Sequence, residues 1–172
     1  LAERMVLCGD GAPWIWKWSK ECYPSAIQIL DFYHASEKLS EFAVASLPTD
    51  QVDPWIAEQK EGLMNNQVEK VIARIEKIQV TGSQAQEKKK AVLHYYQQNI
   101  KRMQYKTFRD QGLMIGSGPI EAAHRTVIQK RIKLSGQRWT VKGANNVINL
   151  RTIKHSNLWT SIVINKIFNV AA

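Results

Sequence analysis

Three acidic positions in this sequence have the residue type and the local setting that metal-dependent chemistry requires. Asp10 ends a short apolar run, Asp31 ends a second one, and Glu121 lies at the start of a predicted helix much later in the chain. Carboxylates at strand ends, together with one from a later helix, can converge on divalent metal. Mg²⁺ prefers hard oxygen ligands, and two such ions about 4 Å apart activate water or a 3′-hydroxyl for phosphodiester chemistry.

Each of these acids also has a simpler interpretation, which the local sequence leaves open. Asp10 lies between two glycines, where an aspartate forms a turn equally well. Asp31 precedes a predicted helix, where the N-cap is the more common use of an aspartate. Glu121 falls in the first turn of its helix and there offsets the helix dipole. His34, in an aromatic-rich segment, is more typical of a packed histidine than of a ligand.

Positive charge gathers in the C-terminal part of the chain. The net formal charge is +9, yet residues 1–96 carry 11 Lys and Arg against 13 Asp and Glu, a net charge of −2. Residues 97–172 carry 13 basic residues against Asp110 and Glu121, a net charge of +11. This bias exceeds what solubility needs, although a solvated basic face is the simpler alternative. It predicts a polyanionic partner, and double-stranded DNA is the natural one.

The basic residues near Glu121 are the expected phosphate contacts. They are Arg125, Lys130, Arg131, Lys133, Arg138, Lys142, Arg151 and Lys154. Trp139 could stack on an unpaired base, although core packing is the simpler interpretation for it. The lysine run over residues 88–90 predicts a solvated helix face that could also touch flanking DNA.

Length and composition favour one domain, or part of one. A chain of 172 residues that is 44% hydrophobic can bury one full core. Cys8 and Cys22 are too few for a disulfide framework and too far apart for a close-spaced zinc pair, so they are expected to be reduced thiols. There is no apolar run near the roughly 20 residues of a membrane helix and no signal-peptide pattern. We therefore expect a soluble, cytoplasmic protein with no membrane partner.

The pattern of apolar, proline and glycine residues predicts two strands followed by helices. The strands are expected at residues 5–8 and 26–30, with a short aromatic helix from Pro13 between them, whose tryptophans Trp14, Trp16 and Trp18 pack on the sheet. Helices are then expected from 32 to about 46, from 53, from about 66 to 80, from 84 past 95 with a continuation over 99–109, from 118, over 141–155 and over 158–168.

Three blocks of sequence stand out by their order and spacing. The first is Asp-Gly-Ala-Pro-Trp-Ile-Trp over residues 10–16, and the second is Gln-Ile-Leu-Asp-Phe-Tyr-His-Ala over residues 28–35. The third is Ile-Gly-Ser-Gly-Pro-Ile-Glu over residues 115–121, with Arg138 and Trp139 further on. In this order they resemble ISKra-type bacterial insertion-sequence transposases, and the resemblance covers nearly the whole chain.

The resemblance implies an α/β fold that is mostly helical in the part present. It would be the C-terminal portion of a ribonuclease-H-like DDE core, interrupted by an all-helical insertion as in Mutator-related enzymes. Residues 1–46 would hold the last two core strands and a helix, residues 47–112 the insertion, and residues 113–172 the helix of the catalytic glutamate with basic C-terminal helices.

The resemblance also implies functional residues. Asp10 would be the second catalytic aspartate and Glu121 the catalytic glutamate, and both would bind Mg²⁺ or Mn²⁺ in the complete enzyme. Asp31 and His34 match the family's Asp-x-x-His signature, which is thought to assist at the active site or the transposon end. The DNA partners would be the transposon ends and the target, bound by a homo-oligomer at the bacterial nucleoid.

In the family, the first catalytic aspartate lies on a strand that precedes the two strands expected here. The sequence, which begins at Leu1, contains no counterpart of that strand. We therefore expect a transposase fragment that is inactive alone, completed by an upstream fragment, and prone to poor solubility or self-association because its sheet edges are open. Two other interpretations remain: a non-catalytic, basic DNA-binding protein that regulates the intact enzyme, and a purely structural helical protein whose acids are all caps.

Overall fold

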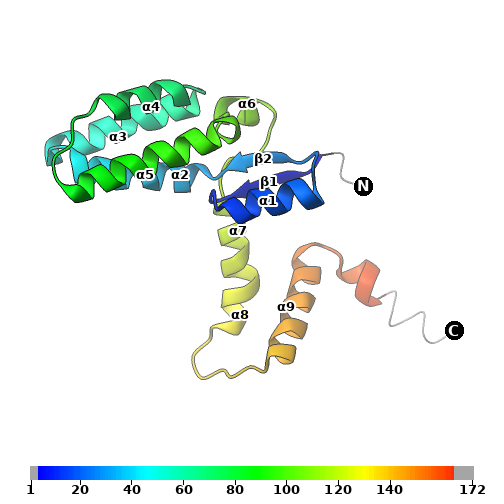
Figure 1. The fold of residues 1–172 in the computed structure, drawn as a ribbon. Helices are drawn as coiled ribbons and strands as arrows, with labels where there is room; N and C mark the ends of the chain where they lie inside the picture. The colour runs from blue at the N-terminus through cyan, green and yellow to red at the C-terminus, as the bar shows by residue number, and fades with distance from the viewer. Residues whose placement is uncertain (1–3, 165–172) are drawn as a thin grey trace. The chain divides into compact units, whose positions relative to one another are not determined.

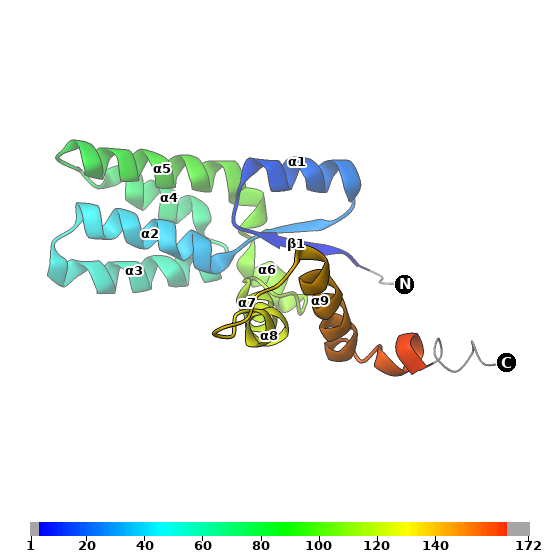
Figure 2. The ribbon, with the colours of Figure 1, turned by 90° about the horizontal axis from the view of Figure 1, so that it is seen from below.

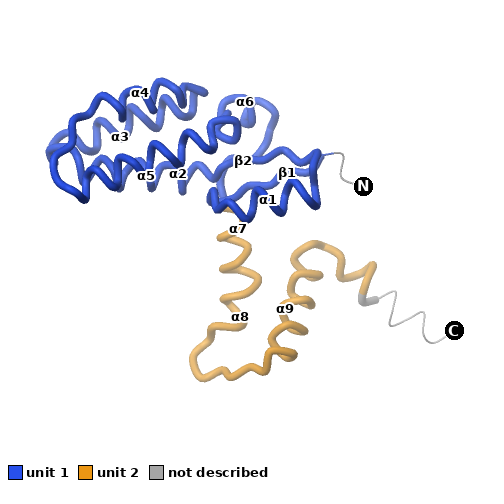
Figure 3. The backbone as a smooth tube through the Cα atoms, in the orientation of Figure 1, with its two compact units in different colours: residues 1–117 blue, residues 118–172 orange. Residues whose placement is uncertain are grey.

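The chain is mostly helical and contains a small parallel sheet, in agreement with the predicted mostly helical α/β class (Figures 1 and 2). The computed structural model describes the backbone of residues 4–164 and the side chains as far as residue 162. The chain divides into two compact units, residues 1–117 and 118–172, and each is described by itself (Figure 3). None of the helices in the described part is long and apolar enough to cross a membrane.

Unit 1 opens with a strand, a helix and a second strand. β1 (Val6–Gly9) and β2 (Ile27–Leu30) lie parallel, with Val6 opposite Ile27 and Gly9 opposite Leu30. Parallel strands need a crossover, and α1 (Pro13–Cys22) supplies it, beginning at a proline that suits the first helical position. Both strands lie within one residue of their predicted positions. Because they are parallel and in register, their carboxyl ends meet at one edge of the sheet.

Four helices pack beside this sheet: α2 (Phe32–Ser46), α3 (Thr49–Met64), α4 (Val68–Lys77) and α5 (Ser83–Asn99). α2 packs against α3 and α5, and α4 packs against the same two helices (Figures 1 and 2). The predicted break at Gly82 is confirmed by its φ of 90°, a left-handed conformation that glycine adopts without a steric penalty.

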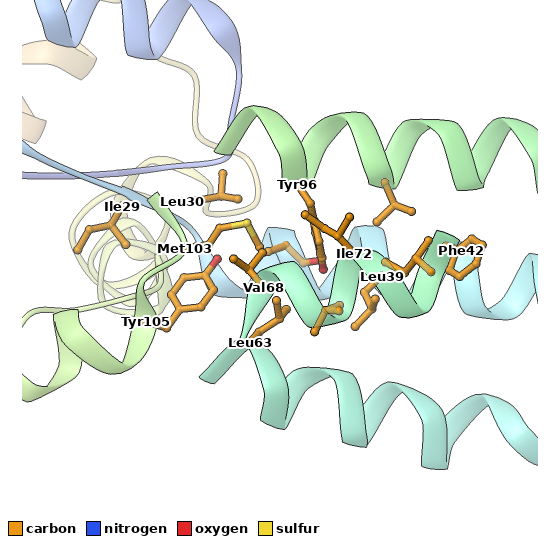
Figure 4. Close-up of a cluster of buried hydrophobic side chains, with 14 of the residues drawn as sticks. Ile29, Leu30, Leu39, Phe42, Leu63, Val68, Ile72, Tyr96, Met103 and Tyr105 are labelled. Atoms are coloured by element: carbon orange, nitrogen blue, oxygen red, sulfur yellow. The ribbon is translucent and has the colours of Figure 1, made fainter. Parts of the chain in front are cut away.

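One hydrophobic cluster joins the sheet to the helices (Figure 4). Ile29 and Leu30 of β2 continue into side chains of α2, α4 and α5, including Leu39, Ile72 and Tyr96. Of the apolar positions expected on this helix, Val68, Val71, Ile72 and Ile75 are buried, whereas Ile78, just past the end of α4, is only partly buried. Residues 1–46 and 47–112 therefore share this cluster, in which the apolar side of α4 faces inward as its spacing requires.

Two predicted helix boundaries are wrong, and packing or capping explains both. α3 begins at Thr49, so Pro54 lies inside the helix. Pro48 directly precedes the first turn, and Asp50 within that turn stabilises the positive end of the helix dipole. The predicted continuation over residues 99–109 is interrupted. A 3₁₀ turn, η1 (Ile100–Arg102), is followed by α6 (Tyr105–Asp110), and Met103 between them is fully buried in the core cluster, which favours the interruption.

The three tryptophans of α1 do not all pack on the sheet, contrary to the prediction. Trp16 is 6% exposed, but Trp14 and Trp18 are 69% and 42% exposed. Positions four apart share one helix face, whereas the residue midway between them points to the opposite side. Only Trp16 lies on the inward face of α1.

Unit 2 consists of short helical segments and one longer helix. α7 (Gly118–Ala123), a π-helical turn η2 (His124–Gln129) and α8 (Lys130–Ile132) follow one another. The predicted start at Gly118 is confirmed. α9 (Val141–His155) has the predicted bounds, capped by the Thr140 hydroxyl, which accepts a hydrogen bond from Gly143 N. Of the helix predicted over residues 158–168, η3 (Thr160–Ile164) is present, and residues 165–168 lie outside the described residues.

Candidate functional site

The sheet brings Asp10 and Asp31 to the same edge. Asp10 directly follows β1, Asp31 directly follows β2, and the last residues of the two strands lie opposite one another. The backbone N–H of Asp31 donates to the carbonyl of Gly9 at 2.8 Å. The two acids are therefore neighbours across adjacent parallel strands, as the strand-end positions in the sequence predict.

Asp10 forms a turn and keeps part of its carboxylate accessible. Its Oδ1 accepts a hydrogen bond from the Ala12 backbone N–H at 2.9 Å, whereas Oδ2 accepts none from the residues that the structure describes. The hydroxyl of Tyr95, from α5, donates to the Asp10 carbonyl oxygen. Gly11 has a φ of 94°, and a Cβ atom there would lie 2.5 Å from Tyr95 Cε2. The turn therefore depends on glycine and on a contact with a helix 85 residues away.

Asp31 is buried and caps α2. Its side chain is 1% exposed, and its Oδ1 accepts hydrogen bonds from the backbone N–H groups of Tyr33 at 2.7 Å and His34 at 3.2 Å. Its Oδ2 accepts from the Ser117 backbone N–H at 2.6 Å. We call Asp31 with these three N–H groups the Asp31 junction. The N-cap interpretation of Asp31 is thus confirmed.

The Asp31 junction keeps this aspartate ionised. Burial by itself would raise the pKa of Asp31, but hydrogen bonds from the Ser117 side chain and from the backbone of His34, Ser117 and Tyr33 outweigh burial and lower the pKa. These donors favour the charged form because each one points a partial positive charge at the carboxylate. Both oxygens are already engaged, so Asp31 has little capacity left to bind a metal ion.

The segment that precedes α7 is fastened to the start of α2. The backbone N–H of Phe32 donates to the carbonyl of Ile115 at 2.9 Å, next to the bond between Ser117 and Asp31. Gly116 lies so close to Tyr33 that a Cβ atom there would be 2.7 Å from the Tyr33 ring. This close approach explains a glycine in the third sequence block, and the sequence alone did not indicate that the second and third blocks touch.

His34 lies near Asp31 without a good hydrogen bond to it. Its Nδ1 is 3.5 Å from Asp31 Oδ1, which is too long for an effective hydrogen bond, while 42% of the side chain is exposed. This Nδ1 atom is buried and has no hydrogen-bond partner among the described residues. The structure thus places the His34 ring beside the Asp31 junction, to which His34 contributes only its backbone N–H.

Glu121 lies on α7, in unit 2, as an exposed residue in the first turn of its helix. It follows Ser117 of the Asp31 junction by four positions in the sequence. Within the described residues, no group of three or more His, Cys, Asp or Glu side chains is arranged to hold a metal ion.

The predicted DNA-contacting residues of unit 2 are mainly on its surface. Seven of the eight basic side chains are exposed, and Arg151 is half-buried. The Arg151 guanidinium donates to the carbonyl oxygens of Thr126 and Val127, so it ties α9 to the π-helical turn. Arg131 lies over the Trp139 ring, 5.6 Å from its centroid. The Trp139 ring is half-buried and is not among the core residues found in the described part of the chain, so the core packing expected of it is not observed.

Comparison with known proteins adds no relative to this picture: no family model, no curated protein and no solved structure matches the chain. The function is therefore inferred from the residues, their geometry and the motifs of the sequence. The two aspartates at the sheet edge and the basic surface of unit 2 are the features that bear on it most directly.

Proposed function

We propose that this chain is part of a DDE-type DNA transposase of the ISKra kind, which cuts and transfers DNA strands at the ends of an insertion sequence. The observation that carries the proposal is the pair Asp10 and Asp31 at the carboxyl ends of adjacent parallel strands. The fastening of residues 115–117 at Asp31 supports it further, because this segment leads directly to the helix of Glu121. A ribonuclease-H-like arrangement of the core belongs to the same proposal.

Asp10 fits a metal ligand better than Asp31 does. Asp10 is exposed and has one carboxylate oxygen without a donor among the described residues, whereas both oxygens of Asp31 are engaged. In the proposal, Asp10 and Glu121 hold Mg²⁺ or Mn²⁺. Such an ion would activate water or a 3′-hydroxyl and stabilise the leaving oxygen of a phosphodiester.

Asp31 acts through other groups in this proposal and is a positioning residue. Its ionised carboxylate holds the first turn of α2 and the backbone of Ser117 together. The backbone leading to Glu121 is therefore fixed at one point in unit 1. His34 lies next to this point, and its partly exposed ring is available to contact DNA rather than to orient Asp31.

DNA binding relies mainly on unit 2 in the proposal. Residues 118–172 contain nine Lys and Arg and a single acid, Glu121, which gives this unit a net charge of +8. Exposed lysines and arginines bind phosphates without reading sequence, so binding is expected to weaken steeply with salt. Arg131, Arg151 and Lys154 share the lining of a cavity of about 200 Å³ in this unit.

A non-catalytic DNA-binding protein is the second candidate function. It is favoured by one observation, namely that the described residues contain no group of three metal-ligating side chains. In this alternative the same basic surface binds transposon ends and excludes the intact enzyme from them. DNA binding is common to both functions, so metal-dependent cutting distinguishes them.

The test is nicking of supercoiled DNA that carries the sequences flanking the gene, in Mg²⁺ or Mn²⁺. The chain is assayed alone and after co-expression with the product of the adjoining upstream reading frame. We expect nicking by the pair only, lost in both Asp10→Asn and Glu121→Gln while DNA binding is retained. Asp53→Asn removes an exposed carboxylate of α3 and serves as the matched control.

A second readout locates the metal without requiring activity. Fe²⁺ with ascorbate and peroxide cleaves a protein backbone next to a bound ion, and we expect fragments that end near residue 10, absent from Asp10→Asn. Soluble, DNA-bound protein that neither nicks DNA nor shows this cleavage would reject the catalytic proposal and support the non-catalytic one.

A further inference from the structure

A basic groove runs between α1, α2 and α5, within unit 1. One cavity of about 1000 Å³ extends from Gly11 and Pro13 to Lys88 on α5, and a second of about 740 Å³ extends to Lys101 in η1. The two cavities share Lys20, Gln98 and Arg102 in their linings, so they are adjacent parts of one hollowed surface. We call it the α1–α5 groove.

The lining of this groove is far more positive than the rest of its unit. Six cations line it against one acid, Glu41; they are Lys17, Lys20, Lys38, Lys88, Lys101 and Arg102. Residues 1–117 as a whole carry 15 Lys and Arg against 14 Asp and Glu, a net charge of +1. Folding therefore gathers six of the 15 cations of this unit, and only one of its 14 acids, along one groove.

Half of these cations already have partners. Lys38 and Lys88 pair with Glu41 at 3.3 Å and 2.6 Å, and this lowers the pKa of Glu41. Arg102 lies 4.5 Å from the Trp16 ring centroid, and its Nε donates to Gln28 at 2.8 Å. These contacts hold the walls of the groove together, since they join α2 to α5 and η1 to the sheet and α1.

The other three cations are available to a ligand. Lys17, Lys20 and Lys101 are exposed and form no ion pair with any described residue. Pro13, Lys17 and Lys20 recur at spacings of four and three along α1, so they share one face of that helix, and all three line the groove. Uncompensated ammonium groups along a hollow attract an extended anion, because fields of like sign add within it.

The groove begins at the candidate site. Gly11, which lines it, directly follows Asp10, and Tyr95 lines it while donating its hydroxyl to the Asp10 carbonyl. A chain of phosphates lying in the groove would therefore reach the exposed carboxylate of Asp10 at one end. The eight basic residues predicted to bind DNA all lie in unit 2, so none of them lines this groove.

We propose that the α1–α5 groove binds the sugar–phosphate backbone of a DNA strand that leads away from Asp10, with Lys17, Lys20 and Lys101 contacting successive phosphates. The choice of DNA as the polyanion rests on the proposed function. The groove adds a second DNA-binding surface, in the half of the chain whose sequence is not basic overall.

The test compares two triple variants of the full chain that lose the same charge. One carries Lys17→Gln, Lys20→Gln and Lys101→Gln in the groove. The control carries Lys70→Gln, Lys77→Gln and Lys90→Gln, which are exposed lysines of α4 and α5 that do not line the groove. Binding of fluorescein-labelled duplex and forked DNA is measured by anisotropy between 50 and 300 mM KCl.

We expect the groove variant to bind at least about tenfold more weakly at low salt, with a salt slope reduced by about 2 to 3, since each lost phosphate contact removes about 0.9 from the slope. The control should keep the native slope. Lysine acetylation read by mass spectrometry gives an independent measure: bound DNA should protect Lys17, Lys20 and Lys101 but not Lys70, Lys77 and Lys90.

The outcomes separate this inference from the proposed function. Equal losses in the two triple variants, or acetylation of the groove lysines that DNA leaves unchanged, would overturn the groove while DNA binding by unit 2 stood. Absence of DNA binding by the native chain at 50 mM KCl would overturn both. Inorganic phosphate that competes at millimolar concentration as effectively as DNA would indicate a small-anion site and would also overturn the proposal.

Discussion

A single carboxylate, that of Asp31, joins two backbone segments that lie 86 residues apart in the sequence. It accepts hydrogen bonds from the first turn of α2 through one oxygen and from Ser117 through the other. Asp10, one strand away, has an accessible oxygen instead. At the scale of residues, two aspartates in equivalent positions at strand ends therefore do different work: one organises the backbone, and the other can meet a ligand.

Asp31→Asn should destabilise the chain by about 1 to 3 kcal/mol, because an amide cannot accept from every donor that converges on the carboxylate. The measurement is urea unfolding at pH 7. Asp10→Asn is the matched control, since asparagine also forms the turn and Asp10 is exposed, so its effect should be within about 0.5 kcal/mol. Equal effects of the two substitutions would contradict the Asp31 junction.

The difference in the free energy of unfolding between the native chain and Asp31→Asn should depend on pH with a defined sign. Folding lowers the pKa of Asp31, so near that pKa the Asp31 side chain binds fewer protons in the folded state than in the unfolded state. The stabilisation is present above the ordinary aspartate pKa of about 3.9 and is lost as the pH falls through the lower folded value. Unfolding of the native chain and of Asp31→Asn, compared from pH 7 to pH 3, should therefore converge at the acid end. A difference that widens in acid would refute this linkage.

At the scale of elements, tight turns and helix ends depend on contacts with distant parts of the chain. The turn after β1 uses Gly11, and Tyr95 of α5 fills the space where a side chain would go. The C-terminal end of α4 is held by Lys89, whose ammonium donates to the carbonyls of Glu76 and Ile78, both at 2.7 Å. The contacts of α5 thus determine the ends of two other elements.

Gly11→Ala should destabilise the chain clearly more than Gly82→Ala. Both glycines have left-handed backbone, with φ of 94° and 90°, so both substitutions carry a similar conformational cost of about 1 kcal/mol or more. Only at Gly11 would the new Cβ also meet the Tyr95 ring, while nothing lies within 4 Å at Gly82. Thermal unfolding followed by circular dichroism compares the two. Equal shifts in melting temperature would mean that Tyr95 moves aside freely.

Lys89 and Lys90, within the lysine run at residues 88–90, should respond differently to substitution by methionine. Lys89→Met removes a cation from the carbonyls at the end of α4 and should cost about 0.5 to 1 kcal/mol. Lys90→Met changes an exposed side chain and should have almost no effect on the free energy of unfolding. The same urea titration measures both, and a neutral Lys89→Met would show that this cap does not stabilise the helix. The predicted solvated face thus applies to Lys90, whereas Lys88 and Lys89 have partners.

At the scale of the whole molecule, uncovered surface and charge determine how the chain behaves in solution. The described sheet has two strands, and α1 exposes Trp14 and Trp18. The Tyr23 ring meets the Trp18 ring edge to face, with ring centroids 5.3 Å apart. Strand edges and exposed aromatic rings both favour association with other surfaces. The net charge of +9 opposes this by mutual repulsion, which salt screens.

The chain should therefore self-associate as ionic strength rises, with an average mass in light scattering that increases between 50 and 500 mM NaCl. Trp14→Gln with Trp18→Gln should reduce this increase and destabilise the chain only by the value of the Trp18–Tyr23 contact, about 0.5 to 1.5 kcal/mol, because both rings are on the outer face of α1. Trp16 is excluded from the test because it is buried in the core. A monodisperse monomer at every salt concentration would contradict the prediction.

Sequence by itself determined what depends on neighbouring residues. The positions of the two strands to within one residue, the inward face of α4 and the break at Gly82 follow from local apolar spacing and glycine. The turn at Asp10 and the cap at Asp31 were recognisable as alternatives to metal binding, because short polar side chains form hydrogen bonds with backbone groups within three residues.

Tertiary structure alone determined what depends on residues far apart in the chain. The contact of Ser117 with Asp31, the support of the Asp10 turn by Tyr95 and the collection of lysines in the α1–α5 groove all join segments separated by dozens of residues. The helix that local sequence predicted over residues 99–109 is interrupted at Met103, which is fully buried. The reason is physical: hydrophobic burial depends on surface removed from water rather than on sequence neighbours, so it selects which distant groups meet.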